Sequence, residues 1–94
     1  MLSQIPVDFT KMKEEELNNA ILRAAIIGEL DAINLYEQLA ALTDNKDIRK
    51  VLLDIAKEEK THVGELETLL LRLDREQAKE LKQRKKEVRE LTGT

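Results

Sequence analysis

The amino-acid sequence predicts an all-α protein, on the grounds of its composition and its hydrophobic spacing. Leu, Ala, Glu, Lys and Arg, which are strong helix formers, dominate the 94 residues. One proline and three glycines leave little room for strands and tight turns. Apolar residues recur at three- and four-residue steps, the spacing of amphipathic helices. We therefore expect an antiparallel two-helix hairpin plus a short C-terminal helix, in a single domain covering residues 1–94.

The helix boundaries follow from changes in periodicity along the chain. The first twelve residues contain a proline and lack clear periodicity, so we expect a flexible tail there. The elements are then expected in this order: tail 1–12, helix 13–42, helix 46–73 and helix 75–91.

Capping residues support these boundaries. The turn between the first two helices is polar, and Asp44 or Asn45 is expected to cap the second helix. Asp74 opens the segment Asp74-Arg75-Glu76-Gln77, a capping-box pattern with Gln at its third helical position. Gly93 lies where the third helix is expected to stop.

The two long helices differ in the number of apolar faces that they carry. The second helix has one such face: Ile48, Val51, Leu52, Ile55, Leu66, Leu69 and Leu73. The first helix has two, on nearly opposite sides: Leu22, Ile26, Ile33 and Ala40, and Leu17, Ile21, Ala24, Gly28, Leu35 and Leu42. A helix that is apolar on two sides must be covered on two sides. Because the third helix is short and polar, we expect another subunit to supply the second cover.

Composition also excludes several classes of protein. The absence of cysteine rules out disulfides and thiolate-bound metals and fits a cytoplasmic protein. No apolar run reaches the roughly 18 residues of a membrane span, and the N-terminus lacks a signal-peptide pattern. A net charge of −3 argues against nucleic acid as a partner. The basic run at residues 82–86 is interleaved with acids and lacks aromatics, so we expect a solvated helix face.

Three polar residues interrupt the apolar faces: Glu29 in the first helix, and Glu59 and His62 in the second. The two glutamates are 30 residues apart with their midpoint at Asp44, in the turn. The hairpin should bring both to the same height, about 20 Å from the turn at about 1.5 Å per residue. His62 lies one turn beyond Glu59 on the same face.

This group has the chemistry of a transition-metal site. A buried, unpaired carboxylate costs several kcal/mol unless it is neutralised, paired or bound to a metal. Two carboxylates and an imidazole suit iron or manganese. Ferritin-like di-iron bundles use a Glu from each of two helices and a Glu-x-x-His from each of the other two. This chain has one helix of each kind, so two copies around a two-fold axis would complete a ferritin-like four-helix di-iron bundle.

Two segments, 29–38 and 58–65, resemble the encapsulated ferritins, most closely the archaeal type that can be fused to an encapsulin shell protein. The shared features are the Glu, the Glu-x-x-His and a Tyr seven residues after the first Glu. The resemblance implies a ferroxidase that oxidises Fe²⁺ between paired hairpins. It also implies dimers that assemble into a ring, typically a decamer, and that work inside an encapsulin nanocompartment in the cytoplasm, where the oxidised iron is mineralised and stored.

The resemblance also assigns roles to individual residues. It makes Glu29 and His62 terminal iron ligands and Glu59 the bridge between two irons, with Tyr36 close to the centre. Some members carry an acid at the position of Gly28, on the route by which metal reaches the centre; Asp31 could retain part of that role. Manganese, zinc or calcium could substitute for iron.

Other interpretations remain open from the sequence. His62 could form a simple ion pair with a glutamate while Arg23 or Lys60 neutralises Glu29. Glu37 is expected in a surface salt bridge, and Glu58 and Glu65 in solvent. The whole chain could instead be a fragment of a rubrerythrin-like di-iron peroxidase, or a non-catalytic helical oligomerisation module.

Overall fold

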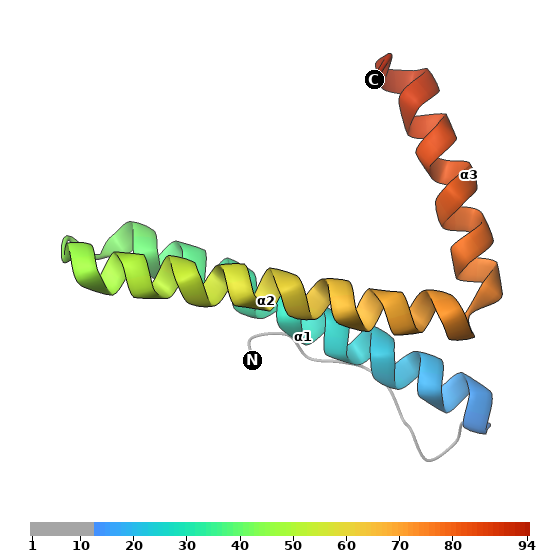
Figure 1. Cartoon of the computed structure of the whole chain (residues 1–94), viewed down its shortest axis with the longest axis horizontal. Helices are drawn as coiled ribbons and strands as arrows, with labels where there is room; N and C mark the ends of the chain where they lie inside the picture. Colours follow the sequence, from blue (N-terminus) through green and yellow to red (C-terminus); the bar gives the residue numbers. More distant parts are fainter. Residues whose placement is uncertain (1–12) are drawn as a thin grey trace.

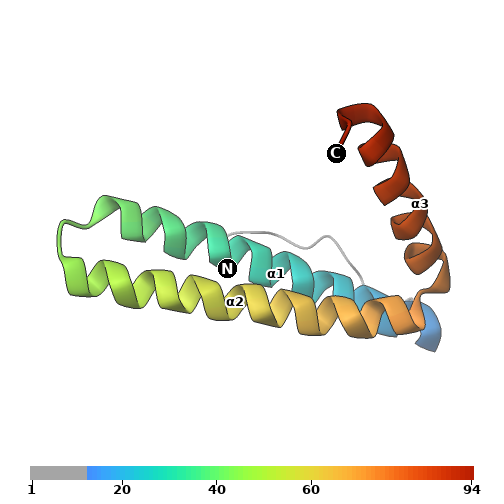
Figure 2. The same ribbon diagram turned by 45° about the horizontal axis from the view of Figure 1, so that its top comes forward.

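The structure, a computed structural model, describes residues 13–94, and all regular secondary structure within them is helical. Helix α1 covers Glu14–Leu42, α2 covers Lys46–Leu73 and α3 covers Arg75–Thr92. Helices α1 and α2 run antiparallel as a long hairpin, and α3 turns sharply away from its open end (Figure 1; Figure 2). The all-α hairpin is therefore confirmed, and each helix begins and ends within one residue of its expected bounds. The expected tail lies outside the described residues.

The turn at the tip of the hairpin is held by side chains on both sides of it. Asn45 caps α2, because its side-chain oxygen accepts hydrogen bonds from the backbone N–H groups of Asp47 and Ile48, both at 3.0 Å. Arg49 reaches back to α1 and donates to the carbonyl of Ala40 at 3.1 Å and to that of Thr43. A cation thus satisfies carbonyls at the C-terminal end of α1, where the helix dipole favours positive charge.

Asp74 sets the corner between α2 and α3. Its carboxylate accepts a hydrogen bond from the backbone N–H of Gln77 at 3.0 Å, as the capping pattern predicts, and also pairs with Arg23 of α1. The Gln77 hydrogen bond and then the Arg23 charge lower the pKa of Asp74 below its usual value, outweighing the opposite effect of burial. One carboxylate therefore starts α3 and ties the corner to α1.

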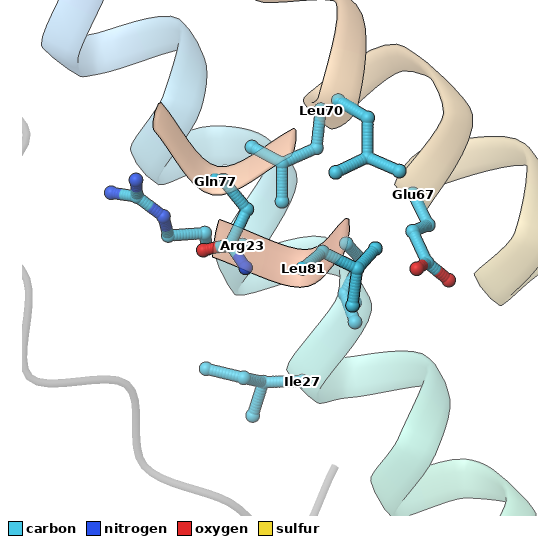
Figure 3. Close-up of a pocket in the computed structure, with 8 residues that line it drawn as sticks. Arg23, Ile27, Glu67, Leu70, Gln77 and Leu81 are labelled. Atoms are coloured by element: carbon cyan, nitrogen blue, oxygen red, sulfur yellow. The ribbon is translucent and has the colours of Figure 1, made fainter. Parts of the chain in front are cut away.

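A hollow lies beneath this corner, and side chains from all three helices line it (Figure 3). Ile27 of α1, Leu70 of α2 and Leu81 of α3 supply much of its apolar wall. At the far end of α3, Gly93 adopts φ +78°, and its N–H donates to the carbonyl of Arg89 at 2.8 Å. This left-handed conformation favours glycine and ends the helix as expected.

The core of the single chain is small and rich in alanine. Among residues 13–94, the buried apolar side chains are Ala20, Ile33, Ala40, Ala56 and Leu70. Alanine at the contact between α1 and α2 lets the two helices approach closely, but it buries little surface per residue. None of the described helices is long and apolar enough to cross a lipid bilayer.

The predicted buried face of α2 is wrong for four of its seven members. They are between 46% and 59% exposed in the single chain: Ile48, Val51, Leu69 and Leu73. Helix α1 instead packs against an adjacent side of α2, on which Ala56 and Leu70 are buried. The sequence pattern joined two adjacent strips of one broad apolar surface, and one helix can cover only one of them.

The two apolar faces predicted for α1 also divide between covered and open positions. Ile33 and Ala40 of the first face are buried against α2. In the second face Gly28 is buried, but Ile21 and Leu42 are exposed. Helix α3 does not cover them, because it leaves the hairpin at the corner (Figure 1).

Candidate metal centre

The structure brings the three predicted ligands together on one side of the hairpin. Glu29 comes from α1, and Glu59 and His62 come from successive turns of α2. One ligand atom from each residue lies within 4.8 Å of the others. The Nδ1 atom of His62 is 3.3 Å from Oε2 of Glu59 and 3.5 Å from Oε2 of Glu29. The register of the hairpin therefore places both carboxylates at the height of the imidazole.

The Glu29 carboxylate carries an unsatisfied oxygen. Its Oε2 is buried and accepts no hydrogen bond from residues 13–94, although it lies near the ring of His62. Buried polar atoms are nearly always partnered, and leaving one unpartnered costs about 1–3 kcal/mol. An unpartnered carboxylate oxygen aimed at a second carboxylate and an imidazole is the arrangement that a bound cation would satisfy.

The expectation that all three groups are buried is wrong for His62. The side chains of Glu29 and Glu59 are 27% and 19% exposed, but that of His62 is 48% exposed. The imidazole lies on the side of α2 that α1 leaves open. Val51 and Leu69 are also exposed and lie eleven and seven residues from His62, close to whole helical turns, so the three residues share one face of α2.

Neighbouring cations do not neutralise Glu29. Arg23 pairs with Asp74 at the α2–α3 corner. Lys60 pairs with Glu37, with Nζ 3.0 Å from Oε2, which confirms the expected surface salt bridge. The alternative in which Arg23 or Lys60 balances Glu29 is therefore wrong.

Both predicted accessory residues, Tyr36 and Asp31, lie on α1. Tyr36 is half-buried on α1, seven residues after Glu29 and therefore close to the same helical face. Asp31 is half-buried and interacts with its surroundings. Their roles in reaching or supporting a metal stay predictions. Glu58 and Glu65 are exposed, as expected of solvated carboxylates.

The ligand types of this group suit iron, but one chain supplies too few ligands for a complete di-iron centre. Carboxylate oxygens and an imidazole suit a first-row transition metal. One chain offers three residues, fewer than two six-coordinate metals require. The geometry thus describes part of a centre, and it leaves the face beside His62 open for further ligands.

Comparison with known proteins agrees with the fold. The sequence profile of the family described as Rubrerythrin matches residues 20–93. The chain is 61% identical over 80 residues to the "Ferritin-like-encapsulin shell fusion protein" of Pyrococcus furiosus, covering 85% of the chain and 23% of that protein. It is 40% identical over 83 residues to the "Encapsulin nanocompartment cargo protein EncC" of Myxococcus xanthus, covering 88% of the chain and 63% of that protein. The chain therefore spans less than two thirds of either relative.

A solved structure matches over the whole chain. The crystal structure of the encapsulated ferritin domain from Pyrococcus furiosus has a TM-score of 0.86 and 53% identity, covering 100% of this chain and 98% of that one. Fold and site together thus define a ferritin-like helical protein. The chain belongs to the rubrerythrin family and to the encapsulated ferritins, which confirms the resemblance noted in its sequence.

Membership of this family implies binding of a di-iron centre. The candidate group of Glu29, Glu59 and His62 has the residue types that such a centre uses. Substitution of iron by manganese, zinc or calcium stays a prediction.

Proposed function

We propose that this chain is a ferroxidase whose centre forms between two copies of the hairpin. Its activity would be the oxidation of Fe²⁺ to Fe³⁺. The observation that carries the proposal is the convergence of Glu29, Glu59 and His62, with one Glu29 oxygen buried and unpartnered. These residues would act as the metal ligands, and the family resemblance adds that Glu59 bridges two irons.

Iron is the substrate here, and it supplies the electron that passes to dioxygen or peroxide. The two carboxylates from each chain stabilise the higher charge of Fe³⁺ more than that of Fe²⁺, because hard oxygen donors prefer the harder cation. His62 adds a neutral nitrogen donor. The Glu37–Lys60 pair holds the Lys60 ammonium on Glu37, although Lys60 is the immediate neighbour of Glu59. Lys60 therefore does not neutralise the Glu29 and Glu59 carboxylates, which remain available to bind a cation.

The assembly is part of the proposal. A two-fold axis beside His62 would supply each ligand twice, and the dimers would build a ring, for which ten copies is the expectation. Two relatives carry the names of an encapsulin shell fusion and an encapsulin cargo protein. We therefore propose that the chain works inside an encapsulin nanocompartment in the cytoplasm and delivers iron for mineralisation and storage.

Iron oxidation by purified variants tests this function. Fe²⁺ is mixed with the protein without oxygen, dioxygen is then added, and near-ultraviolet absorbance follows the formation of Fe³⁺. We expect His62→Ala and Glu29→Ala to fall to the rate of protein-free buffer. Glu58→Gln, which removes an exposed carboxylate next to Glu59, should keep the wild-type rate. Oxidation by His62→Ala at the wild-type rate would refute the proposal.

The rubrerythrin match favours a second candidate, a di-iron peroxidase. Such an enzyme would reduce peroxide with electrons from a separate donor. A rubredoxin-type donor holds its iron with cysteines, and these 94 residues contain none. Peroxide consumption that depends on an added donor, without net accumulation of Fe³⁺, would select this alternative. A non-catalytic helical module instead predicts a native mass that is independent of Fe²⁺ and no oxidation.

A further inference from the structure

The stretch of α2 that carries His62 is loosely packed in the single chain. Residues 60–65 surround this ligand, and all of them except Val63 are exposed. The buried residues of α2, Ala56 and Leu70, lie outside this stretch on either side. A helical segment with few buried side chains, whose backbone hydrogen bonds face water, opens locally more readily than the core. We call residues 60–65 the His62 segment.

A glycine lies inside the His62 segment, two residues after the ligand. Glycine disfavours a helix because its backbone loses the most conformational freedom on folding. Compared with alanine, it raises the population of a locally open helix about fivefold. Close packing does not account for Gly64, since a Cβ atom there would meet nothing in residues 13–94 within 4 Å beyond its chain neighbours and the adjoining helix backbone. Gly64 therefore loosens the helix without making room for a neighbour in this chain.

Thr68 weakens the same part of α2. Its hydroxyl donates a hydrogen bond to the carbonyl of Gly64 at 2.7 Å. In an α-helix that carbonyl also accepts the backbone N–H four residues on, so the hydroxyl competes for it. Side chains that bond back to the carbonyl four residues earlier slightly destabilise helices and often bend them. Glycine and threonine thus act on one carbonyl, directly after the turn that carries His62.

Contacts with α1 hold the carboxylate ligands and the start of the segment. The side chains of Glu29 and Glu59 are 27% and 19% exposed, against 48% for His62. Lys60, the first residue of the segment, pairs with Glu37 of α1 at 3.0 Å. The part of the segment that follows His62 is therefore the loose part, while the two carboxylates stay fixed between the helices.

Gly64 also lies away from the face on which His62 projects. Residues two apart on a helix point about 200° apart, so Gly64 is on nearly the opposite side of α2. In the proposed shared centre, a second copy that covers His62 would leave Gly64 in water. The loose part of the helix would therefore remain loose when the centre is complete.

Release of oxidised iron is the step that such mobility would serve. Under the proposed function, Glu29 and Glu59 bind Fe³⁺ more strongly than Fe²⁺, because hard oxygen donors prefer the harder cation. The ligands that favour oxidation therefore also retain the product. In many enzymes, product release rather than chemistry sets the turnover rate.

We infer that Gly64 is a positioning residue that lets the His62 segment open, so that the imidazole withdraws and Fe³⁺ leaves the centre. This inference rests on the proposed function, because it concerns the product of that reaction. Gly64 acts on His62 through the helix backbone and touches no metal itself. Glu29 and Glu59 keep their places while the segment opens, so the next Fe²⁺ meets both carboxylates already in position.

The variant Gly64→Ala separates release from oxidation. The first turnover is measured with Fe²⁺ matched to the number of centres, and the steady state with Fe²⁺ in large excess, both after addition of dioxygen. We expect the first turnover to keep the wild-type rate and the steady-state rate to fall about fivefold. In the metal-free protein, amide hydrogen exchange in residues 60–65 should slow by about the same factor.

Two further variants distinguish mobility from general stability. Asn34→Ala raises helix propensity at an exposed position of α1, so it should raise the melting temperature while leaving both iron rates unchanged. Gly64→Ala/Glu65→Gly moves the glycine by one residue within the His62 segment. It should recover most of the steady-state rate and of the fast hydrogen exchange, which a loss of specific packing at Gly64 would not allow.

Other results would overturn the inference. Slower hydrogen exchange in Gly64→Ala with an unchanged steady-state rate would show that release does not use this opening. Unchanged hydrogen exchange would show that Gly64 does not loosen the segment, and an equal fall in both iron rates would place its effect on the oxidation itself. A wild type that oxidises no iron would instead refute the ferroxidase, and hydrogen exchange would still test the mobile segment by itself.

Discussion

Replacing Glu29 with glutamine should make the metal-free protein more stable while removing its iron chemistry. In the wild type, carboxylate oxygens of Glu29 and Glu59 lie within 4.8 Å of each other. Two unit charges at that separation repel by about 3.5 kcal/mol at an effective dielectric of about 20, and by about 0.9 kcal/mol in water. Since both side chains are about one-fifth to one-quarter exposed, we expect a repulsion between these limits.

Glutamine keeps the shape of Glu29 and removes its charge. We therefore expect a gain of about 1–2 kcal/mol in the free energy of unfolding with EDTA present. For a chain of this size, 1 kcal/mol corresponds to a rise of about 4–8 °C in melting temperature. Thermal melting followed by circular dichroism, at one fixed protein concentration, measures this rise.

The experiment includes a control variant at another glutamate of α1 and a titration with metal. Glu37→Gln removes an exposed acid of α1 that is paired with Lys60 at 3.0 Å, so its melting temperature in EDTA should stay level or fall slightly. Added Mn²⁺ should raise the melting temperature of the wild type much more than that of Glu29→Gln. A lower melting temperature for Glu29→Gln than for the wild type in EDTA would refute the electrostatic reasoning.

Three further predictions concern the ends of the helices. Asn45→Ala removes the cap of α2 and should cost about 1 kcal/mol, or about 4–8 °C in melting temperature, without changing the rate of iron oxidation. Asp74→Asn should weaken the loss of stability at acid pH. Gln77 and Arg23 lower the pKa of Asp74, so the ionised carboxylate stabilises the fold fully above the usual carboxyl pKa range. This stabilisation disappears as the pH falls through the lowered pKa, and a series of unfolding measurements at decreasing pH shows the difference between the variant and the wild type. Gly93→Ala strains a residue at φ +78° and should speed hydrogen exchange in the last turn of α3 while leaving the global melting temperature unchanged.

The helices and the ligand group could be predicted from the sequence because they depend on local rules. Hydrophobic periodicity and capping residues set the helix ends, and the equal distances of Glu29 and Glu59 from the turn set their common height. The choice between Asp44 and Asn45 as cap needed coordinates, since both side chains can cap a helix. The interpretation of Glu37 as a salt-bridged surface residue is also confirmed, although Glu37 lies near the Glu29 stripe two turns on.

The burial of individual apolar residues could not be predicted in the same way. Periodicity shows that Val51 and Leu69 belong to an apolar surface, but not which neighbour covers it. The surface of α2 is wide enough for two covers, and α1 supplies one. The exposure of His62 has the same cause. The direction of α3 was equally hidden, because it depends on the contact between Asp74 and Arg23, which are 51 positions apart in the chain.

The alanine-rich contact between α1 and α2 has a consequence for the life of a newly made chain. A hairpin whose buried side chains are mostly methyl groups gains little from folding alone, so its resistance to proteases should grow with its concentration. Dilute chains would be cleared, and crowded chains would be protected. In the proposed shared centre, the half-exposed His62 would be covered only by a second copy, so the proposed iron oxidation would begin only where enough copies have gathered.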